Sequence, residues 1–271
     1  GPHLELECAL AEFKRGEAAL SFSSGYAANL ATIPCLVGSD DAVYCDRLNH
    51  ASLVDACRLS RARLRVYPHG DLEFLDRHLG RDRRESGRQL VVTESVFSMD
   101  GDLADLPGLG EICRRRNALL YVDDAHGLGV LGHGGRGAEC MAPAHVVMGT
   151  FSKALGGAGA FIATARAVTE SVLNHGRSFV YSTAPPPAAA AAALEALRIL
   201  SEEPERRMAL RARAEQLAQG LGRPVPAAIA IALTGESEAA VTAAAKLREQ
   251  GLLIVAIRPP TVPRGTARLR M

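Results

Sequence analysis

Short apolar runs alternate with amphipathic stretches along most of this chain. Runs such as Leu90-Val-Val92 and Leu119-Leu-Tyr-Val122 are continuous rather than alternating, which is typical of strands covered on both faces. The pattern predicts strands at 42–45, 64–67, 89–93, 118–122, 145–149 and 160–163. It predicts helices between them at 27–36, 51–59, 72–79, 109–117 and 167–175. Repeated strand–helix units predict an α/β fold, with a mostly parallel central sheet and helices on both faces.

A second, smaller domain is expected towards the C-terminus. Pro185-Pro-Pro187 opens an alanine-rich helix that continues through Leu200, and Ser201-Glu-Glu-Pro204 breaks it. A charged helix (205–219), a strand region rich in proline and alanine, a helix (236–250) and a strand (252–257) follow. We therefore predict a large domain at 1–204 and a small α+β domain at 205–271.

Composition limits the classes of function. The 271 residues carry a net charge of +1, whereas nucleic-acid binders usually show a clear basic excess, so we expect no nucleic-acid partner. We also expect no membrane association, because no signal peptide is recognisable and no apolar run approaches the ~20 residues that span a bilayer. The six cysteines show no C-x-x-C pair and no metal-type spacing, which predicts free thiols, no metal site and a cytoplasmic location.

Arginines form two clusters despite this overall balance of charge. The clusters are Arg58, Arg61, Arg63 and Arg65, then Arg81, Arg83, Arg84 and Arg88. We interpret them as solvated faces. Contact with a phosphorylated substrate is the alternative, because guanidinium groups fit phosphate well.

One of the three lysines has an unusual setting. Lys14 and Lys246 lie in charged helical patterns, where no special role is needed. Lys153, in Thr150-Phe-Ser-Lys-Ala-Leu-Gly156, is flanked by hydroxyls, apolar residues and glycines. This segment and Tyr121-Val-Asp-Asp-Ala-His-Gly127 each follow an apolar strand, which is where open α/β sheets place their ligands.

Asp123, His126 and Lys153 together predict a site for pyridoxal 5′-phosphate. A lysine can form a Schiff base with the cofactor aldehyde, and a carboxylate keeps the ring nitrogen protonated, so that the ring accepts electrons. Asp123 alone could simply cap a strand end. Its combination with Lys153 favours a functional role.

Further segments could complete this site. Gly25 opens a helix in Ser23-Ser-Gly-Tyr-Ala-Ala-Asn29, and its N-terminus, with the Thr150 and Ser152 hydroxyls, suits a phosphate; an ordinary helix cap is the alternative. His50 follows a strand and could stack on an aromatic cofactor, or only cap or pack. Glu94 and Ser98 could face the same crevice, or belong to a plain turn closed by Asp100-Gly101.

Two arginines near the C-terminus are candidates for binding a carboxylate. The prolines of Ile257-Arg-Pro-Pro-Thr-Val-Pro263 predict a rigid extended loop before the segment Thr266-Ala-Arg-Leu-Arg270. In a strand, Arg268 and Arg270 share one face. A bidentate guanidinium is the usual receiver of an amino-acid carboxylate, although either residue could be a surface charge.

In combination, these motifs resemble the α-oxoamine synthase family, pyridoxal-phosphate enzymes of fold type I. The resemblance runs from His3 to Arg270 and is carried by Ser24-Gly-Tyr-Ala-Ala-Asn29, Asn49-His-Ala-Ser52, Glu94-Ser-Val-Phe-Ser-Met-Asp-Gly-Asp102, Asp123-Asp-Ala-His-Gly127 and Thr150-Phe-Ser-Lys153. Ile257-Arg-Pro-Pro-Thr-Val-Pro263 looks most like the branch of the family that serves biotin biosynthesis.

The resemblance implies a role for each matching residue. Lys153 would bind the cofactor and shuttle the Cα proton, and His50 would stack on the ring and contact substrate. Asp123 would pair with the pyridine nitrogen and His126 with the ring hydroxyl. The residues implied in binding the cofactor are Gly25, Tyr26, Ser98 and Thr150, with Ser182 and Thr183 reaching a neighbouring subunit's phosphate. Arg270 would hold the substrate carboxylate, and Thr261 would contact substrate.

The implied reaction is a decarboxylative condensation of L-alanine with pimeloyl-CoA or a pimeloyl-carrier protein, in a homodimer with shared active sites. The alternatives are a sister synthase that uses glycine or serine, and a non-catalytic scaffold subunit; the latter typically lacks the lysine. Family members carry an N-terminal arm before the region of His3 and a last strand and helix after Met271. We therefore expect a large domain without its arm and an incomplete small domain.

Overall fold

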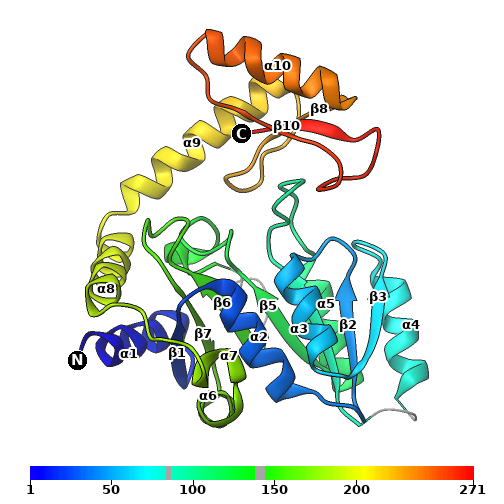
Figure 1. The fold of residues 1–271 in the computed structure, drawn as a ribbon, viewed down its shortest axis with the longest axis vertical. Helices are drawn as coiled ribbons and strands as arrows, with labels where there is room; N and C mark the ends of the chain where they lie inside the picture. The colour runs from blue at the N-terminus through cyan, green and yellow to red at the C-terminus, as the bar shows by residue number, and fades with distance from the viewer. Residues whose placement is uncertain (84–86, 138–143) are drawn as a thin grey trace. The chain divides into compact units, whose positions relative to one another are not determined.

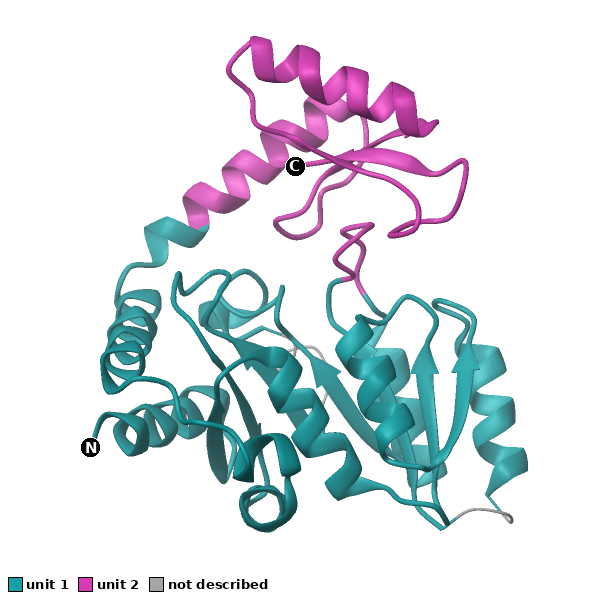
Figure 2. Cartoon of the chain, viewed as in Figure 1, with its two compact units in different colours: residues 1–96, 104–207 teal, residues 97–103, 208–271 magenta. Residues whose placement is uncertain are grey.

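A computed structural model describes residues 1–83, 87–137 and 144–271 (Figure 1). The chain divides into two compact units, residues 1–96 with 104–207 and residues 97–103 with 208–271 (Figure 2). The sequence did not predict that residues 97–103 would join the second unit. No helix in the described ranges is long and apolar enough to cross a bilayer.

A seven-stranded sheet forms the centre of the first unit. Its strands are β1 (Ala18–Phe22), β2 (Ala42–Asp46), β3 (Arg63–Tyr67), β4 (Gln89–Glu94), β5 (Leu119–Asp123), β6 (Val146–Thr150) and β7 (Ala160–Thr164). The strand order is β1-β7-β6-β5-β4-β2-β3, and β7 alone runs antiparallel to its neighbours. The predicted α/β fold with a mostly parallel sheet is therefore confirmed.

All six strands predicted for the large domain form, and five of them end one residue later than the apolar pattern indicated. The extra residues are polar: Asp46, Glu94, Asp123, Thr150 and Thr164. The ladder of backbone hydrogen bonds continues one residue past each apolar run, so a buried polar group closes the strand.

Helices cover both faces of the sheet (Figure 1). Those of the first unit are α1 (Pro2–Lys14), α2 (Gly25–Leu36), α3 (Ala51–Leu59), α4 (Leu72–Asp82), α5 (Leu106–Arg116), the short η1 (His133–Gly135), α6 (Arg166–His175), α7 (Arg177–Val180), α8 (Pro187–Glu202) and the start of α9 (Pro204–Leu221). Alternation along β2 assigns the faces: Val43 and Cys45 pack in the cluster containing α2 and α3, and Ala42 and Tyr44 in the cluster containing α4 and α5.

The packing of α1 and the place of β1 in the sheet were not predicted from the sequence. Leu6 and Leu10 of α1 are buried with α8 and with Phe161 of β7, and β1 pairs with the antiparallel strand β7. A serine interrupts the apolar residues of Ala18–Phe22, so the segment lacks the continuous apolar run that marked strands such as β4 and β5. Its place in the sheet depends on a partner far along the chain.

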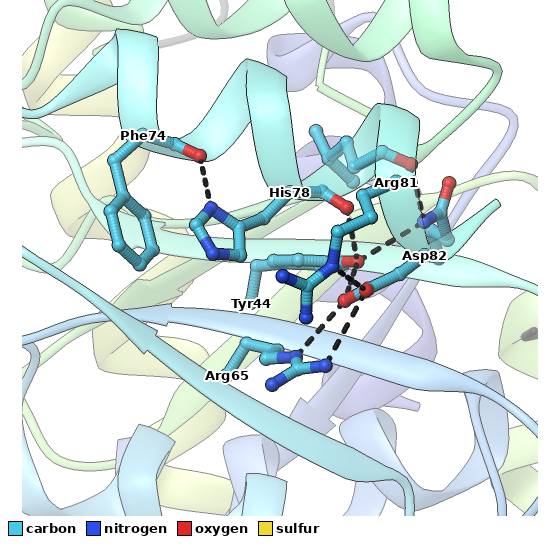
Figure 3. Close-up of polar contacts among 8 residues, drawn as sticks. Tyr44, Arg65, Phe74, His78, Arg81 and Asp82 are labelled. Carbon is cyan, nitrogen blue, oxygen red and sulfur yellow. Dashed lines mark hydrogen bonds and ion pairs between the residues drawn. The ribbon is translucent and has the colours of Figure 1, made fainter.

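A buried carboxylate attaches α4 to the edge of the sheet (Figure 3). Asp82 has a fully buried side chain whose Oδ2 accepts hydrogen bonds from Tyr44 Oη (3.1 Å) and Arg65 Nε (3.0 Å), and Arg81 Nε lies 3.5 Å from Oδ1. Burial alone would raise the pKa of Asp82, but the bonds and charge of Arg65 outweigh it, so that pKa is lowered. Arg65 of the first cluster is thus structural, whereas Arg81 and Arg88 of the second cluster are largely exposed, and Arg84 lies outside the described residues.

The second unit is built on a three-stranded antiparallel sheet of order β8-β10-β9, with β8 (Ile231–Gly235), β9 (Val255–Ile257) and β10 (Ala267–Arg270). The remainder of α9 and α10 (Ser237–Glu249) belong to it. Arg268 is buried, donates to the Met99 carbonyl (3.1 Å) and pairs with Asp100. Residues 97–103 are thus linked to β10 by charge and hydrogen bonding.

We expect Asp82→Asn to lower the free energy of unfolding at pH 7 by about 1.5–3 kcal/mol, because it removes hydrogen bonds to a charged group. The lowered pKa means that this contribution is present above the usual value of 3.8 and is lost as the pH falls through the folded-state pKa. Urea unfolding should therefore show a difference that shrinks on acidification. The exposed Asp40→Asn is the control, and an equal loss at pH 7 and at about pH 2 would contradict the expectation.

Candidate active site

Polar residues close four neighbouring strands at one edge of the sheet. Asp46, Glu94, Asp123 and Thr150 end β2, β4, β5 and β6, which run parallel to one another. The carboxyl ends of these strands therefore meet, and open α/β sheets bind ligands in the crevice at this edge.

A cavity of about 150 Å³ lies at this edge. It is lined by Gly25, Tyr26, His50, Ser52, Glu94, Asp123, Ala125, His126, Met148, Thr150, Ser152 and Lys153. Nine of the residues that the sequence suggested thus line one cavity: Gly25, Tyr26, His50, Glu94, Asp123, His126, Thr150, Ser152 and Lys153. Their individual roles remain predictions.

The other suggested residues lie elsewhere. Ser182 and Thr183 are exposed and line a different cavity in the first unit, with His3, Glu7 and Ser23 among its residues. Ser98, Thr261 and Arg270 belong to the second unit, where Arg270 Nε donates to the Ser98 carbonyl (2.7 Å) and Thr261 is exposed. Arg268 and Arg270 both contact residues 98–100, as expected for two residues on one face of a strand.

Asp123 is the buried acid of the cavity. Its Oδ1 accepts a hydrogen bond from the backbone N–H of Ala125 (3.0 Å), and its Oδ2 accepts a hydrogen bond from Asn29 Nδ2 (3.1 Å). Burial raises the pKa of Asp123, although these bonds, the charge of Lys153 and the protonated form of His50 act in the opposite direction. The Ala125 and Asn29 donors are both neutral, so a further cation in the cavity would stabilise the carboxylate.

Glu94 is a second acid beside Asp123. It is buried, and its Oε1 accepts the backbone N–H of His50. Burial, followed by the neighbouring Asp123 charge, raises the pKa of Glu94 to about 9. Two adjacent buried carboxyl groups do not readily ionise together. The raised pKa means that Glu94 holds a proton at neutral pH.

The phosphate end of the predicted site has two components. The N-terminus of α2 opens at Gly25 and is capped by Ser24, whose Oγ accepts the Ala27 N–H (3.1 Å). Across the cavity, Thr150 Oγ1 donates to the Gly159 carbonyl (2.9 Å) and lies 2.8 Å from Ser152 Oγ. Helix N–H groups and hydroxyls are suitable donors for phosphate oxygens.

These residues fit pyridoxal phosphate. The cofactor has a ring nitrogen that binds a proton, an aldehyde and a phosphate, and the cavity offers the buried Asp123 carboxylate, the Lys153 amine and the N-terminus of α2. The fit rests chiefly on Asp123, since a buried carboxylate with neutral donors is stabilised by a protonated ring nitrogen.

The prediction for Lys14 was wrong. Instead of lying on a charged helix surface, its side chain is 1% exposed, and Nζ lies 3.1 Å from Oδ2 of the fully buried Asp124. Asp124 Oδ1 also accepts from Ser95 Oγ (2.7 Å), and Lys14 Nζ donates to the Arg136 carbonyl. This ion pair anchors Asp124, the residue next to Asp123. Asp124 lies 110 positions from Lys14, so the charged helical pattern around Lys14 could not reveal it.

Asn29 and Ser52 lie beside the site, which was not predicted from the sequence. For Glu94, the sequence left two positions open, the crevice or a plain turn, and the structure places it in the cavity. Each of the three lies within a motif that was recognised. Asn29 is one helical turn beyond Gly25, and Ser52 is two residues after His50. Helical periodicity places Asn29 on the face of Gly25, and this signal could have identified it.

Comparison with known proteins identifies the family. The aminotransferase class I and II profile matches residues 2–271. The chain belongs to the aminotransferase class I and II family. Within this family, it is 50% identical over 282 residues to a protein from Geobacter sulfurreducens named 8-amino-7-oxononanoate synthase, covering 99% of this chain and 71% of the relative. The predicted resemblance to the α-oxoamine synthases is thereby confirmed.

Solved structures support the same fold for this aminotransferase-family chain. Serine palmitoyltransferase from S. paucimobilis with bound PLP-myriocin aldimine superposes with a TM-score of 0.94 at 33% identity, covering 100% of this chain and 71% of the other. An 8-amino-7-oxononanoate synthase from Francisella tularensis gives a TM-score of 0.84 at 30% identity, covering 100% and 80%. Both similarities support the predicted fold type I architecture.

We expect Glu94→Gln to stabilise the cofactor-free protein at alkaline pH. The raised pKa means that ionisation of Glu94 opposes folding as the pH rises from about 4.5 towards 9, and glutamine removes this cost. Thermal unfolding should give equal Tm values at about pH 4 and a higher Tm for the variant at about pH 8, by roughly 2–4 °C per kcal/mol. The exposed Glu170→Gln is the control. A variant that is no more stable at pH 8 would contradict the assignment.

We expect Lys14→Met to lower the free energy of unfolding by about 3–5 kcal/mol, because it removes a cation from a buried carboxylate. In the double variant Lys14→Met/Asp124→Asn both charges are absent, so much of the loss should be recovered. Urea unfolding at pH 7 measures both variants, with the exposed Lys246→Met as control. Simply additive losses would argue against coupling between the two side chains.

Proposed function

We propose that this chain catalyses the pyridoxal-phosphate-dependent, decarboxylative condensation of L-alanine with a pimeloyl thioester to 8-amino-7-oxononanoate, a step of biotin biosynthesis. The acyl donor is pimeloyl-CoA or pimeloyl-carrier protein. The observation that carries the proposal is the joint position of Lys153 and the buried Asp123 in one cavity. The 50% identity to a named 8-amino-7-oxononanoate synthase supports the choice of substrates.

In this proposal, residues that line the cavity hold the cofactor. The Asp123 carboxylate keeps the ring nitrogen protonated, His126 contacts the ring hydroxyl, and His50 stacks on the ring. The α2 N-terminus at Gly25 and the Thr150 hydroxyl hold the phosphate. Bound pyridoxal phosphate supplies a conjugated ring that stabilises negative charge at the amino-acid Cα.

Lys153 has two tasks in the proposed reaction. Its Nζ would hold the cofactor covalently, and it is the amine that the substrate amine would replace. The released amine then removes the Cα proton of alanine and later returns a proton to the same carbon. Both tasks need one amine within reach of the reacting carbon, and Lys153 is the lysine that lines the cavity.

The remaining assignments belong to the same proposal. Tyr26 and Ser98 contribute to cofactor binding, Arg270 holds the alanine carboxylate, and Thr261 contacts substrate. The protein acts as a cytoplasmic homodimer, in which Ser182 and Thr183 reach the phosphate of the neighbouring subunit. The exposure of Ser182 and Thr183 and the free thiols of the five described cysteines support this part.

A sister reaction is the second candidate. The high structural similarity to serine palmitoyltransferase, with a TM-score of 0.94, favours an enzyme that uses serine with a long-chain acyl thioester. The two candidates differ in the amino acid consumed and in the acyl group accepted, so a substrate panel separates them.

We expect CoA release from pimeloyl-CoA to depend on L-alanine and to be at least tenfold slower with glycine or serine. Lys153→Ala should abolish release and the visible absorption of the bound cofactor, whereas Lys246→Ala should preserve both. Release can be followed with a thiol reagent and cofactor uptake by absorbance. Preference for serine with palmitoyl-CoA would support the sister reaction. A wild-type protein that never takes up the cofactor would refute both.

A further inference from the structure

A set of hydrogen bonds behind the cavity connects two of its functional residues. Tyr121 Oη donates to Asn29 Oδ1 (2.7 Å), and Asn29 Nδ2 contacts both Asp123 Oδ2 (3.1 Å) and Ser52 Oγ (2.9 Å). Ser52 Oγ lies 2.8 Å from His50 Nδ1. Asn29 and Ser52 are buried, so water does not compete for these groups.

The chemistry of the groups assigns every proton in this set. An ionised carboxylate only accepts, so the Asn29 amide must turn its Nδ2 towards Asp123 and its Oδ1 towards the Tyr121 hydroxyl. The two Nδ2 protons are then used by Asp123 and Ser52. Since Ser52 Oγ accepts from Asn29, its own proton is available for His50 Nδ1.

The backbone N–H of Ser52 determines which atom donates in the hydrogen bond between Ser52 Oγ and His50 Nδ1. His50 is the N-cap of α3, and its Nδ1 also accepts the backbone N–H of Ser52 (3.2 Å). A backbone N–H can only donate, so Nδ1 must present a lone pair. The neutral imidazole therefore carries its proton on Nε2.

We propose that Asn29 and Ser52 are positioning residues of the active site, which hold the Asp123 carboxylate in place and fix His50 in the Nε2–H tautomer. The inference rests on the proposed function for the roles of Asp123 and His50. It adds that neutral His50 can donate a hydrogen bond to a substrate oxygen but cannot accept a proton at Nε2.

The tautomer can be measured without cofactor or substrate. In ¹⁵N NMR of histidine-labelled protein, His50→Gln identifies the His50 ring signals. We expect a protonated-type Nε2 signal and an unprotonated-type Nδ1 signal for the neutral ring. A neutral ring protonated at Nδ1 would overturn the proposal, whatever the enzyme's substrates are.

Variants test whether Ser52 sets this arrangement. Ser52→Ala removes the hydroxyl but leaves the backbone donor, so the Nδ1 signal should shift, and Ser52→Thr should restore it. Ser60→Ala is the matched control, because it removes a buried hydroxyl from the other end of α3, where Ser60 Oγ donates to the Cys57 carbonyl. Unchanged His50 signals in Ser52→Ala would refute a role for Ser52.

The role of Asn29 in holding the Asp123 carboxylate is tested by measuring cofactor affinity as a function of pH. The Asn29 hydrogen bond lowers the pKa of Asp123 against the effect of burial, while Lys153, His50 and Glu94 also face this carboxylate. Asn29→Leu should therefore weaken pyridoxal-phosphate binding by about tenfold to a hundredfold, as for a lost hydrogen bond to a charged group. The loss of binding on acidification should also begin at a higher pH than in the wild type.

The outcomes separate this inference from the proposed function. Uniform weakening in Asn29→Leu, with an unchanged pH profile, would indicate a purely structural role and would overturn the Asn29 part. If Asn29→Leu does not fold, the wild-type tautomer and the Ser52→Ala and Ser52→Thr pair still decide the proposal. If alanine is not a substrate but the tautomer and pH profile are as expected, the proposed function fails and the positioning role stands.

Discussion

The arrangement of the site depends on one carboxylate that is buried at the carboxyl end of β5. Asp123 has the Ala125 N–H and the Asn29 amide as hydrogen-bond donors, and burial raises its pKa. A buried charge is costly unless it is paired and hydrogen-bonded, so the surrounding protein must favour the anion. The neighbouring protonated Glu94 avoids a second negative charge, and Lys153 contributes a positive one.

The sheet makes this environment possible. Because β2, β4, β5 and β6 are parallel, the last residue of each strand lies at the same edge, where Glu94, Asp123 and Thr150 face a cavity rather than bulk water. The helices that follow begin at this edge, and α2 and α3 bring Gly25 and His50 with them. One topology therefore supplies the acids, the imidazole and the helix N-terminus.

A second buried charge shows how the loop after β5 is anchored. Asp124 contacts Lys14 of α1 and Ser95, while its neighbour Asp123 faces the cavity. Adjacent residues of one strand end point to opposite sides, so one can be held by the protein interior while the other binds ligand. The Lys14–Asp124 ion pair thus links the first helix of the chain to the geometry of the site.

Much of the fold and the chemistry could be predicted from the sequence. Continuous apolar runs marked the central strands, and the contrast between Lys153 and the lysines in charged helices pointed to the cofactor, because both signals are local. The extra polar residue at five strand ends, the position of β1 and the burial of Lys14 were not visible, because each depends on a partner distant in sequence. The same reason applies to Asn29 and Ser52: their residue types were known from the motifs, but only tertiary structure brings Asp123 from β5, Asn29 from α2 and His50 from α3 within hydrogen-bonding distance.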